Sequence, residues 1–135
     1  MTISQDLAMP PSVGVSFIDE EHGLLIGMLE QLRLDGVATR IDTAKTEIEE
    51  LGKYIRKHFD FEEDVLFKLD RNEYLRHVKA HKSLLVRFYE MCADIESKDF
   101  TIPYRLATML EEWLHEHIAD YDLTLASLMK ARPTT

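Results

Sequence analysis

The sequence predicts an all-α protein: an up-down-up-down four-helix bundle preceded by an irregular N-terminal arm. Along four stretches of helical length, apolar residues recur at steps of three, four and seven, as in Ile18, Leu25 and Leu29. This spacing places one buried stripe on each helix. The chain of 135 residues also has only 5 glycines and 4 prolines, too few for a loop-rich β fold. Four amphipathic helices with short connections pack most simply as a bundle.

The N-terminal half should contain the arm and two helices. Residues 1–16 form the arm, because two adjacent prolines and a glycine oppose regular structure there. The first helix is expected over about residues 18–34, ending at the Asp35-Gly36 turn. The second is expected over about residues 43–69 and repeats the same apolar rhythm.

The C-terminal half should contain two more helices. The third is expected over about residues 73–96 and the fourth over about residues 102–130, where Pro103 is tolerated in the first turn. Side chains that can accept backbone N–H hydrogen bonds precede three helices and are candidate N-caps: Asp42 or Thr43, Asp70 or Asn72, and Thr101. The chain has no internal repeat, so we expect one domain over residues 1–135.

The composition excludes several classes of function. Sixteen Lys and Arg against 25 Asp and Glu give a net charge of -9, which repels the phosphates of nucleic acids. No run approaches the roughly 18 apolar residues of a membrane span. A single cysteine, Cys92, cannot build a disulfide framework or a cysteine-based zinc site. Without a visible secretory signal, we expect a cytoplasmic domain that binds neither nucleic acid nor membrane.

Polar residues interrupt the apolar stripes of all four helices. Five of the six histidines and one glutamate occupy positions expected to face the bundle axis: His22, His58, Glu62, His77, His81 and His117. An unpaired carboxylate there would destabilise the fold by several kcal/mol. Imidazoles also need partners when buried. A metal is the most economical partner that all of these groups could share.

The spacing of these residues supports a metal site. His58 and Glu62, like His77 and His81, are four residues apart, which stacks two side chains on one helical face. The set exceeds what one ion can accept, so two ions bridged by a carboxylate fit better. Nitrogen and oxygen ligands without thiolates suit iron, manganese or zinc. Zinc usually takes about four ligands, and iron is therefore favoured.

Periodicity leaves two candidates for the second carboxylate ligand, Asp120 and Asp122. On an ideal helix Asp120 lies about 60° from His117 and Asp122 about 140° away. Ideal geometry therefore mildly favours Asp120 and leaves Asp122 as the alternative. His115 lies about 160° around the helix from His117 and is expected to face water.

Four segments together resemble the bacterial hemerythrins. They are Ile18-Asp19-Glu20-Glu21-His22, His58 through Glu63, His77 through His81, and Trp113 through Asp122. The similarity runs from about Val13 to Leu128, and the combined pattern of H, HxxxE, HxxxH and HxxxxD is highly specific. The arm departs from the family pattern, in which many members have a tryptophan upstream of the first histidine.

The resemblance implies a four-helix bundle that holds two irons, joined by an oxo or hydroxo bridge, and binds O2 reversibly. It assigns His77, His81 and His117 to one iron, His22 and His58 to the other, and Glu62 and Asp122 to both as bridges. The HxxxxD spacing thus selects Asp122, which requires a distorted turn after His117. The iron with two imidazoles keeps one position free for O2.

A water-free pocket should surround that position. Its candidate walls are four apolar side chains, for which ordinary core packing is the alternative role: Trp113, Leu114, Ile118 and Phe59. The expected function is non-enzymatic O2 binding for storage, delivery or sensing. The alternatives are a di-iron scavenger or enzyme acting on peroxide, nitric oxide or iron, and a signalling module. Signalling or delivery would need a separate partner protein, and the oligomeric state stays open.

Overall fold

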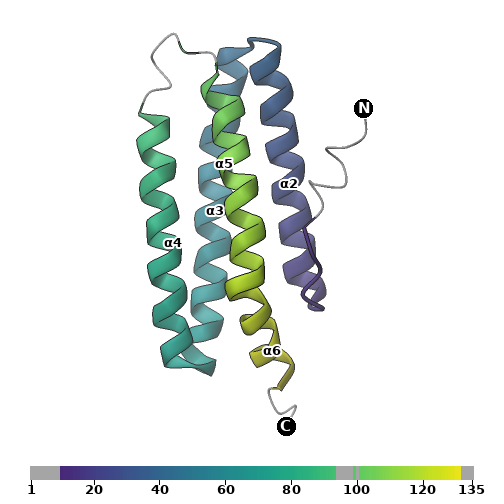
Figure 1. The fold of residues 1–135 in the computed structure, drawn as a ribbon, viewed down its shortest axis with the longest axis vertical. Coiled ribbons are helices and arrows are strands. Elements are labelled where there is room, and N and C mark those ends of the chain that lie inside the picture. Colours follow the sequence, from purple (N-terminus) through teal and green to yellow (C-terminus); the bar gives the residue numbers. More distant parts are fainter. Residues whose placement is uncertain (1–9, 94–98, 100, 132–135) are drawn as a thin grey trace.

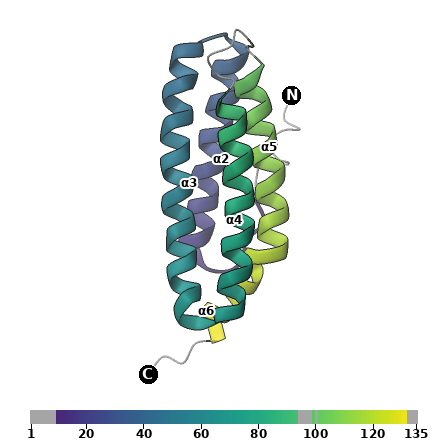
Figure 2. The ribbon, with the colours of Figure 1, turned by 90° about the vertical axis from the view of Figure 1, so that its left-hand side faces the viewer.

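The computed structural model of the protein describes residues 10–93, 99 and 101–131, and shows the predicted all-α four-helix bundle. Figures 1 and 2 show the four rods side by side, with successive rods running in opposite directions. The elements are α2 (Ser16–Val37), α3 (Ile41–Leu69), α4 (Arg71–Cys92), α5 (Ile102–His117), the π-helical segment η1 (Ile118–Asp122) and α6 (Leu123–Ala131). The last three form one continuous rod (Figure 1). Among the described residues, no helix is both long and apolar enough to cross a membrane.

The α2–α3 connection differs from its prediction. α3 begins at Ile41, so Asp42 and Thr43 lie inside the helix and neither caps it. The turn is closed instead by the backbone, because Arg40 N–H donates to the Asp35 carbonyl over 2.9 Å. Thr39 has a φ of 57°, which is uncommon for a residue other than glycine. A turn satisfied by its own backbone needs no side-chain cap.

Of the candidate caps of the two later helices, only one forms a capping hydrogen bond. Asp70 precedes α4 and accepts a hydrogen bond from the Glu73 N–H over 3.0 Å, as an N-cap should. Thr101 occupies the N-cap position of α5, but its hydroxyl donates to Asp99 rather than capping the helix. Pro103 lies in the first turn of α5 as expected. The expected end of the third helix at residue 96 falls outside the described residues.

The described part of the arm contacts both α2 and α6. Val13 is buried, and its N–H donates to the Asp19 carboxylate over 2.8 Å. Ser12 donates its hydroxyl to the same carboxylate over 2.7 Å. Lys130 of α6 donates to the Val13 carbonyl over 2.9 Å. Residues 10–15 therefore join α2 to α6 although they form no helix.

A pair of carboxyl groups links α2 to α3 at the other end of the bundle. Asp35 is buried and accepts hydrogen bonds from Gln31 over 3.1 Å and Arg40 over 3.3 Å. Burial and the adjacent Asp35 raise the pKa of Glu47 to about 7. The hydrogen bond with Glu47 is also the main reason that the pKa of Asp35 is lowered. One proton is thus shared between the two carboxyls near neutral pH.

We expect Glu47→Gln to stabilise the protein above about pH 7, by about 1 kcal/mol. Between the unfolded pKa of 4.5 and the folded pKa of about 7, the native protein holds a proton that the unfolded chain has lost. Stability therefore falls as the pH rises through this range, and glutamine removes that fall while keeping an N–H donor for Asp35. Urea unfolding at about pH 5 and about pH 8 measures the difference. Glu49→Gln, at an exposed position of the same helix, should change neither value.

Candidate metal centre

The structure brings together the seven predicted ligand side chains. Each is buried, with at most 4% of its surface exposed: His22, His58, Glu62, His77, His81, His117 and Asp122. The four rods all contribute, because α2 supplies one histidine, α3 a histidine and a glutamate, α4 two histidines, and α5 with η1 a histidine and an aspartate. Side chains from all four rods therefore meet in one cluster inside the bundle.

On one side of the cluster lie two histidines, here called the two-histidine group. His22 Nε2 is 3.0 Å from Asp122 Oδ2. His58 Nε2 is 3.1 Å from Glu62 Oε2. Potential ligand atoms of these four residues all lie within 4.8 Å of one another. Four donors so close together can surround a single cation.

On the other side lie His77, His81 and His117, the three-histidine group. His81 Nε2 is 3.2 Å from Glu62 Oε1, and His77 and His117 Nε2 are 3.5 and 3.2 Å from Asp122 Oδ1. Each carboxylate thus turns one oxygen toward the two-histidine group and its other oxygen toward the three-histidine group. This is the arrangement expected of carboxylates that bridge two ions.

The imidazoles and carboxylates of the cluster shift one another's pKa values. Burial raises the pKa of Glu62, but the surrounding imidazoles outweigh burial and hold it well below its ordinary value. The pKa of Asp122 is also lowered, against burial and the charge of Glu62. Burial lowers the pKa of His58, yet Glu62 and other acids raise it to about 9. Asp122 and Glu62 likewise raise the pKa of His117 against burial.

Several polar atoms that face the cluster centre have no hydrogen bond. Both oxygens of Glu62, Asp122 Oδ1 and His77 Nε2 are buried without such a partner in the described part of the chain. Buried polar atoms are normally hydrogen-bonded, so these require an explanation. Metal ions would satisfy them, and the all-nitrogen-and-oxygen donor set suits iron or manganese. The residues present therefore fit a pair of such ions.

A local change of helix type selects Asp122 over Asp120. After His117 the helix widens into η1, where Leu123 N–H donates to the carbonyl of Ile118, five residues earlier. The wider turn brings the fifth residue after His117 onto the same face. Asp122 is fully buried, whereas Asp120 is exposed. The preference of ideal periodicity for Asp120 is wrong because the helix is not ideal here.

Three outer carboxylates lie beside the far nitrogens of the cluster histidines, where Glu21 and Glu63 accept hydrogen bonds and Glu73 makes an ion-pair contact without one. They are Glu21 at 2.7 Å from His58 Nδ1, Glu63 at 2.8 Å from His81 Nδ1, and Glu73 at 3.1 Å from His77 Nδ1. Such partners fix the orientation of metal-binding imidazoles. The sequence pattern assigns none of these three carboxylates a role. Glu73 lies four residues before His77, a spacing that the sequence displays. Glu21 contacts a histidine of another helix, which no spacing along the chain indicates.

Aromatic rings hold two of the imidazoles in place. The His117 ring lies between Trp113 and Tyr121, with ring centroids 4.3 and 4.8 Å away and both pairs stacked at 14°. Phe59 stacks on His81 at 3.8 Å. Two of the proposed pocket walls therefore also orient the cluster.

A small cavity adjoins the cluster. It touches His58, His117 and Asp122, and the centre of a water-sized molecule can occupy about 10 Å³ of it. That is close to the space that one such molecule needs. Three of the four predicted pocket residues line it (Phe59, Trp113 and Leu114), whereas Ile118 is buried outside its lining. Four further aliphatic side chains complete the wall: Leu25, Ile55, Leu84 and Leu110.

The fold and the cluster define a metal-binding four-helix bundle. The chain belongs to the hemerythrin family, because the model of the hemerythrin HHE cation-binding domain matches residues 13–128. A bacteriohemerythrin of Stenotrophomonas maltophilia is 28% identical over 120 residues, which cover 89% of this chain and 78% of that protein. No solved structure matches the chain significantly.

Proposed function

We propose that the protein binds O2 reversibly at a carboxylate-bridged di-iron centre. His22 and His58 would hold one iron, the three-histidine group the other, and Glu62 and Asp122 would bridge them. The division of each carboxylate's oxygens between the two histidine groups carries this proposal. Two ferrous ions held in such a site would supply the electrons needed for reversible O2 binding. With one imidazole fewer, the two-histidine side is the side where O2 would bind.

The cavity beside the cluster supports a carrier rather than an enzyme. It borders His58 of the two-histidine group and is otherwise walled mainly by aliphatic and aromatic side chains. Outside the proposed ligands, none of its lining residues carries an acidic or basic group. A wall of this kind disfavours the entry of water and contributes no acidic group beside the proposed ligands. Reversible release is favoured over turnover for that reason.

A purified protein loaded with ferrous iron should develop a visible absorption band in air and lose it under argon, over repeated cycles. Elemental analysis should find two irons per chain. A His58→Ala variant should show no reversible band, because it loses a proposed ligand of the ion on the two-histidine side. Irreversible oxidation of the wild-type protein at the first exposure to air would contradict the proposal. Sustained consumption of peroxide or nitric oxide, absent from His58→Ala, would favour the scavenger instead.

The physiological role is proposed only at the level of O2 storage, delivery or sensing. The bacteriohemerythrin relative agrees with the hemerythrin resemblance from which O2 binding is inferred. The cytoplasmic location expected from the sequence stays a prediction.

A further inference from the structure

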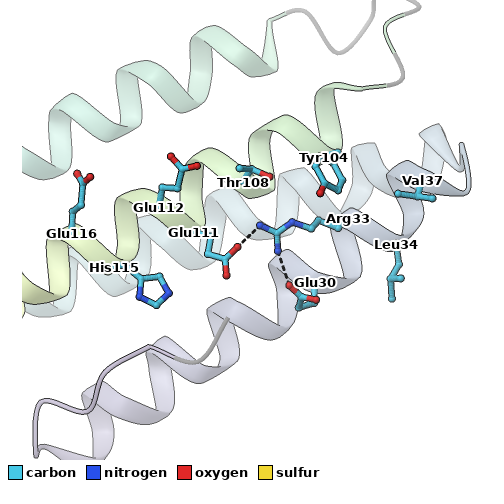
Figure 3. Close-up of a pocket in the computed structure, with 10 residues that line it drawn as sticks. All are labelled: Glu30, Arg33, Leu34, Val37, Tyr104, Thr108, Glu111, Glu112, His115 and Glu116. Atoms are coloured by element: carbon cyan, nitrogen blue, oxygen red, sulfur yellow. Dashed lines mark hydrogen bonds and ion pairs between the residues drawn. The ribbon is translucent and has the colours of Figure 1, made fainter. Parts of the chain in front are cut away.

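An open groove runs along the surface between α2 and α5, away from the metal cluster. Its volume is about 870 Å³, which is within the range of ligand-binding clefts. Figure 3 shows its two ends: Leu34, Val37 and Tyr104 at one, and Glu112, His115 and Glu116 at the other. The proposed O2 function uses none of these residues. The groove therefore calls for a separate explanation.

The first end is apolar and exposed. Leu34 and Val37 near the end of α2 are 63% and 71% exposed, and Tyr104 in the first turn of α5 is 49% exposed. Exposed apolar side chains that cluster on a surface are typical of interaction sites. This end can hold apolar side chains of a partner.

The second end is acidic. Glu112 and Glu116 are exposed, lie four residues apart on α5, and pair with no cation in the described part of the chain. Like charges at this spacing weaken a helix slightly. Between them His115, expected to face water, is half-buried, and its Nε2 is buried without a hydrogen bond. Cations of a partner would neutralise the two carboxylates.

Ion pairs of Arg33 lie at the middle of the groove. Arg33 of α2 pairs with Glu30 over 2.6 Å and with Glu111 of α5, so the two helices are joined by an ion pair that Figure 3 marks. Arg33 pairs with these two acids and not with Glu112 or Glu116. The groove therefore keeps a net negative charge. A preformed groove loses little entropy when a partner binds.

We propose that this groove docks a basic amphipathic helix of a separate protein. Its α5 wall runs from Tyr104 to Glu116, about 18 Å at 1.5 Å per residue, which matches roughly three turns of helix. Such a helix would place apolar side chains against Leu34 and Val37, and lysines or arginines against Glu112 and Glu116. Charge complementarity and the order of the two ends along the groove both favour this occupant.

A second copy of the chain fits the groove less well. In a two-fold symmetric pair, the acidic end of one copy faces either the same end or the apolar end of the other copy. The first arrangement opposes like charges, and the second buries carboxylates against apolar side chains. Both are unfavourable for a chain with a net charge of -9.

The test uses the full chain, as purified, and a fluorescein-labelled helical peptide of about 14 residues. The peptide carries leucines in its first turn and lysines in the next two, all on one face. Fluorescence anisotropy should show saturable binding that weakens as salt is added. Glu112→Lys with Glu116→Lys, and separately Leu34→Asp, should each weaken binding about tenfold or more.

Matched controls separate the groove from the overall charge. Glu49→Lys with Glu90→Lys makes the same charge change on α3 and α4, and Leu75→Asp makes the same apolar-to-acid change at an exposed position of α4. Both should bind the peptide nearly as the wild type does, and circular dichroism should show all variants folded. Equal weakening by the control variants, or equal binding of a scrambled peptide, would overturn the proposal. A concentration-dependent dimer that Leu34→Asp abolishes, without peptide binding, would assign the groove to self-association instead.

Discussion

Replacing Asp122 by asparagine should reduce the affinity for metal by more than about 100-fold, since even partners outside the ligand shell contribute 10- to 100-fold. Asparagine keeps the size of the side chain but removes the charge and one of the two oxygens. Those oxygens face opposite halves of the cluster, with Oδ2 3.0 Å from His22 and Oδ1 3.2 Å from His117. We therefore expect both ions to be affected. Metal content after dialysis, measured by elemental analysis, checks this.

Asp120→Asn is the matched control for this substitution. It makes the same chemical change two residues earlier, at an exposed position that only ideal periodicity would place in the site. It should retain the metal content and thermal stability of the wild type. Loss of metal from Asp120→Asn with retention by Asp122→Asn would show that η1 does not have the conformation described above.

The four rods and six of the seven clustered side chains follow from periodicity. A histidine within an apolar stripe, such as His22 or His77, is visible in the sequence because it breaks a regular pattern. Asp122 is not visible in this way, because its position depends on one extra residue in the turn that begins at Ile118. Only the resemblance to hemerythrins selected it. Periodicity assumes a uniform helix and fails where the helix changes type.

Contacts between distant parts of the chain account for further features that the sequence did not reveal. Glu21 accepts from His58 of another helix, and Asp35 pairs with Glu47 across the α2–α3 interface. Neither pair has a spacing along the chain that marks it. The buried end of the arm at Val13 also depends on Lys130, 117 residues away. Such partners are set by packing, which a single sequence does not display.

Removing the metal should change the direction in which stability depends on pH. In the metal-free protein, the pKa of His58 is raised from 6.5 to about 9 because the attraction of Glu62 and other acids exceeds the effect of burial. The pKa of His117 is raised in the same way. A raised histidine pKa stabilises the fold fully below the unfolded pKa, and that stabilisation is lost as the pH rises through the folded pKa. Metal-free protein should therefore lose stability between pH 6.5 and about 9, by roughly 3 kcal/mol for His58.

The metal-loaded protein should behave in the opposite way at lower pH. A bound ion requires neutral imidazoles, so the loaded fold holds no proton on them at any pH where the metal stays bound. Below pH 6.5 the unfolded chain takes up protons that the loaded fold excludes. The free energy of unfolding then falls as the pH drops. Above pH 6.5 the imidazoles are neutral in both the folded and the unfolded state, so their contribution no longer changes with pH. The two forms should thus lose stability on opposite sides of pH 6.5.

Urea unfolding of chelator-treated and iron-loaded protein, from about pH 5 to about pH 9, measures both profiles. His58→Gln should flatten part of the decline of the metal-free protein above pH 6.5, because glutamine cannot take up the proton. His115→Gln is the matched control, since this histidine lies outside the cluster. If the metal-free protein were equally stable at pH 6.5 and at about pH 9, the cluster would hold neutral imidazoles even without metal. The carboxylates would then lack the counter-charges that hold their pKa values low, and ion pairs within the cluster could not stabilise the metal-free bundle.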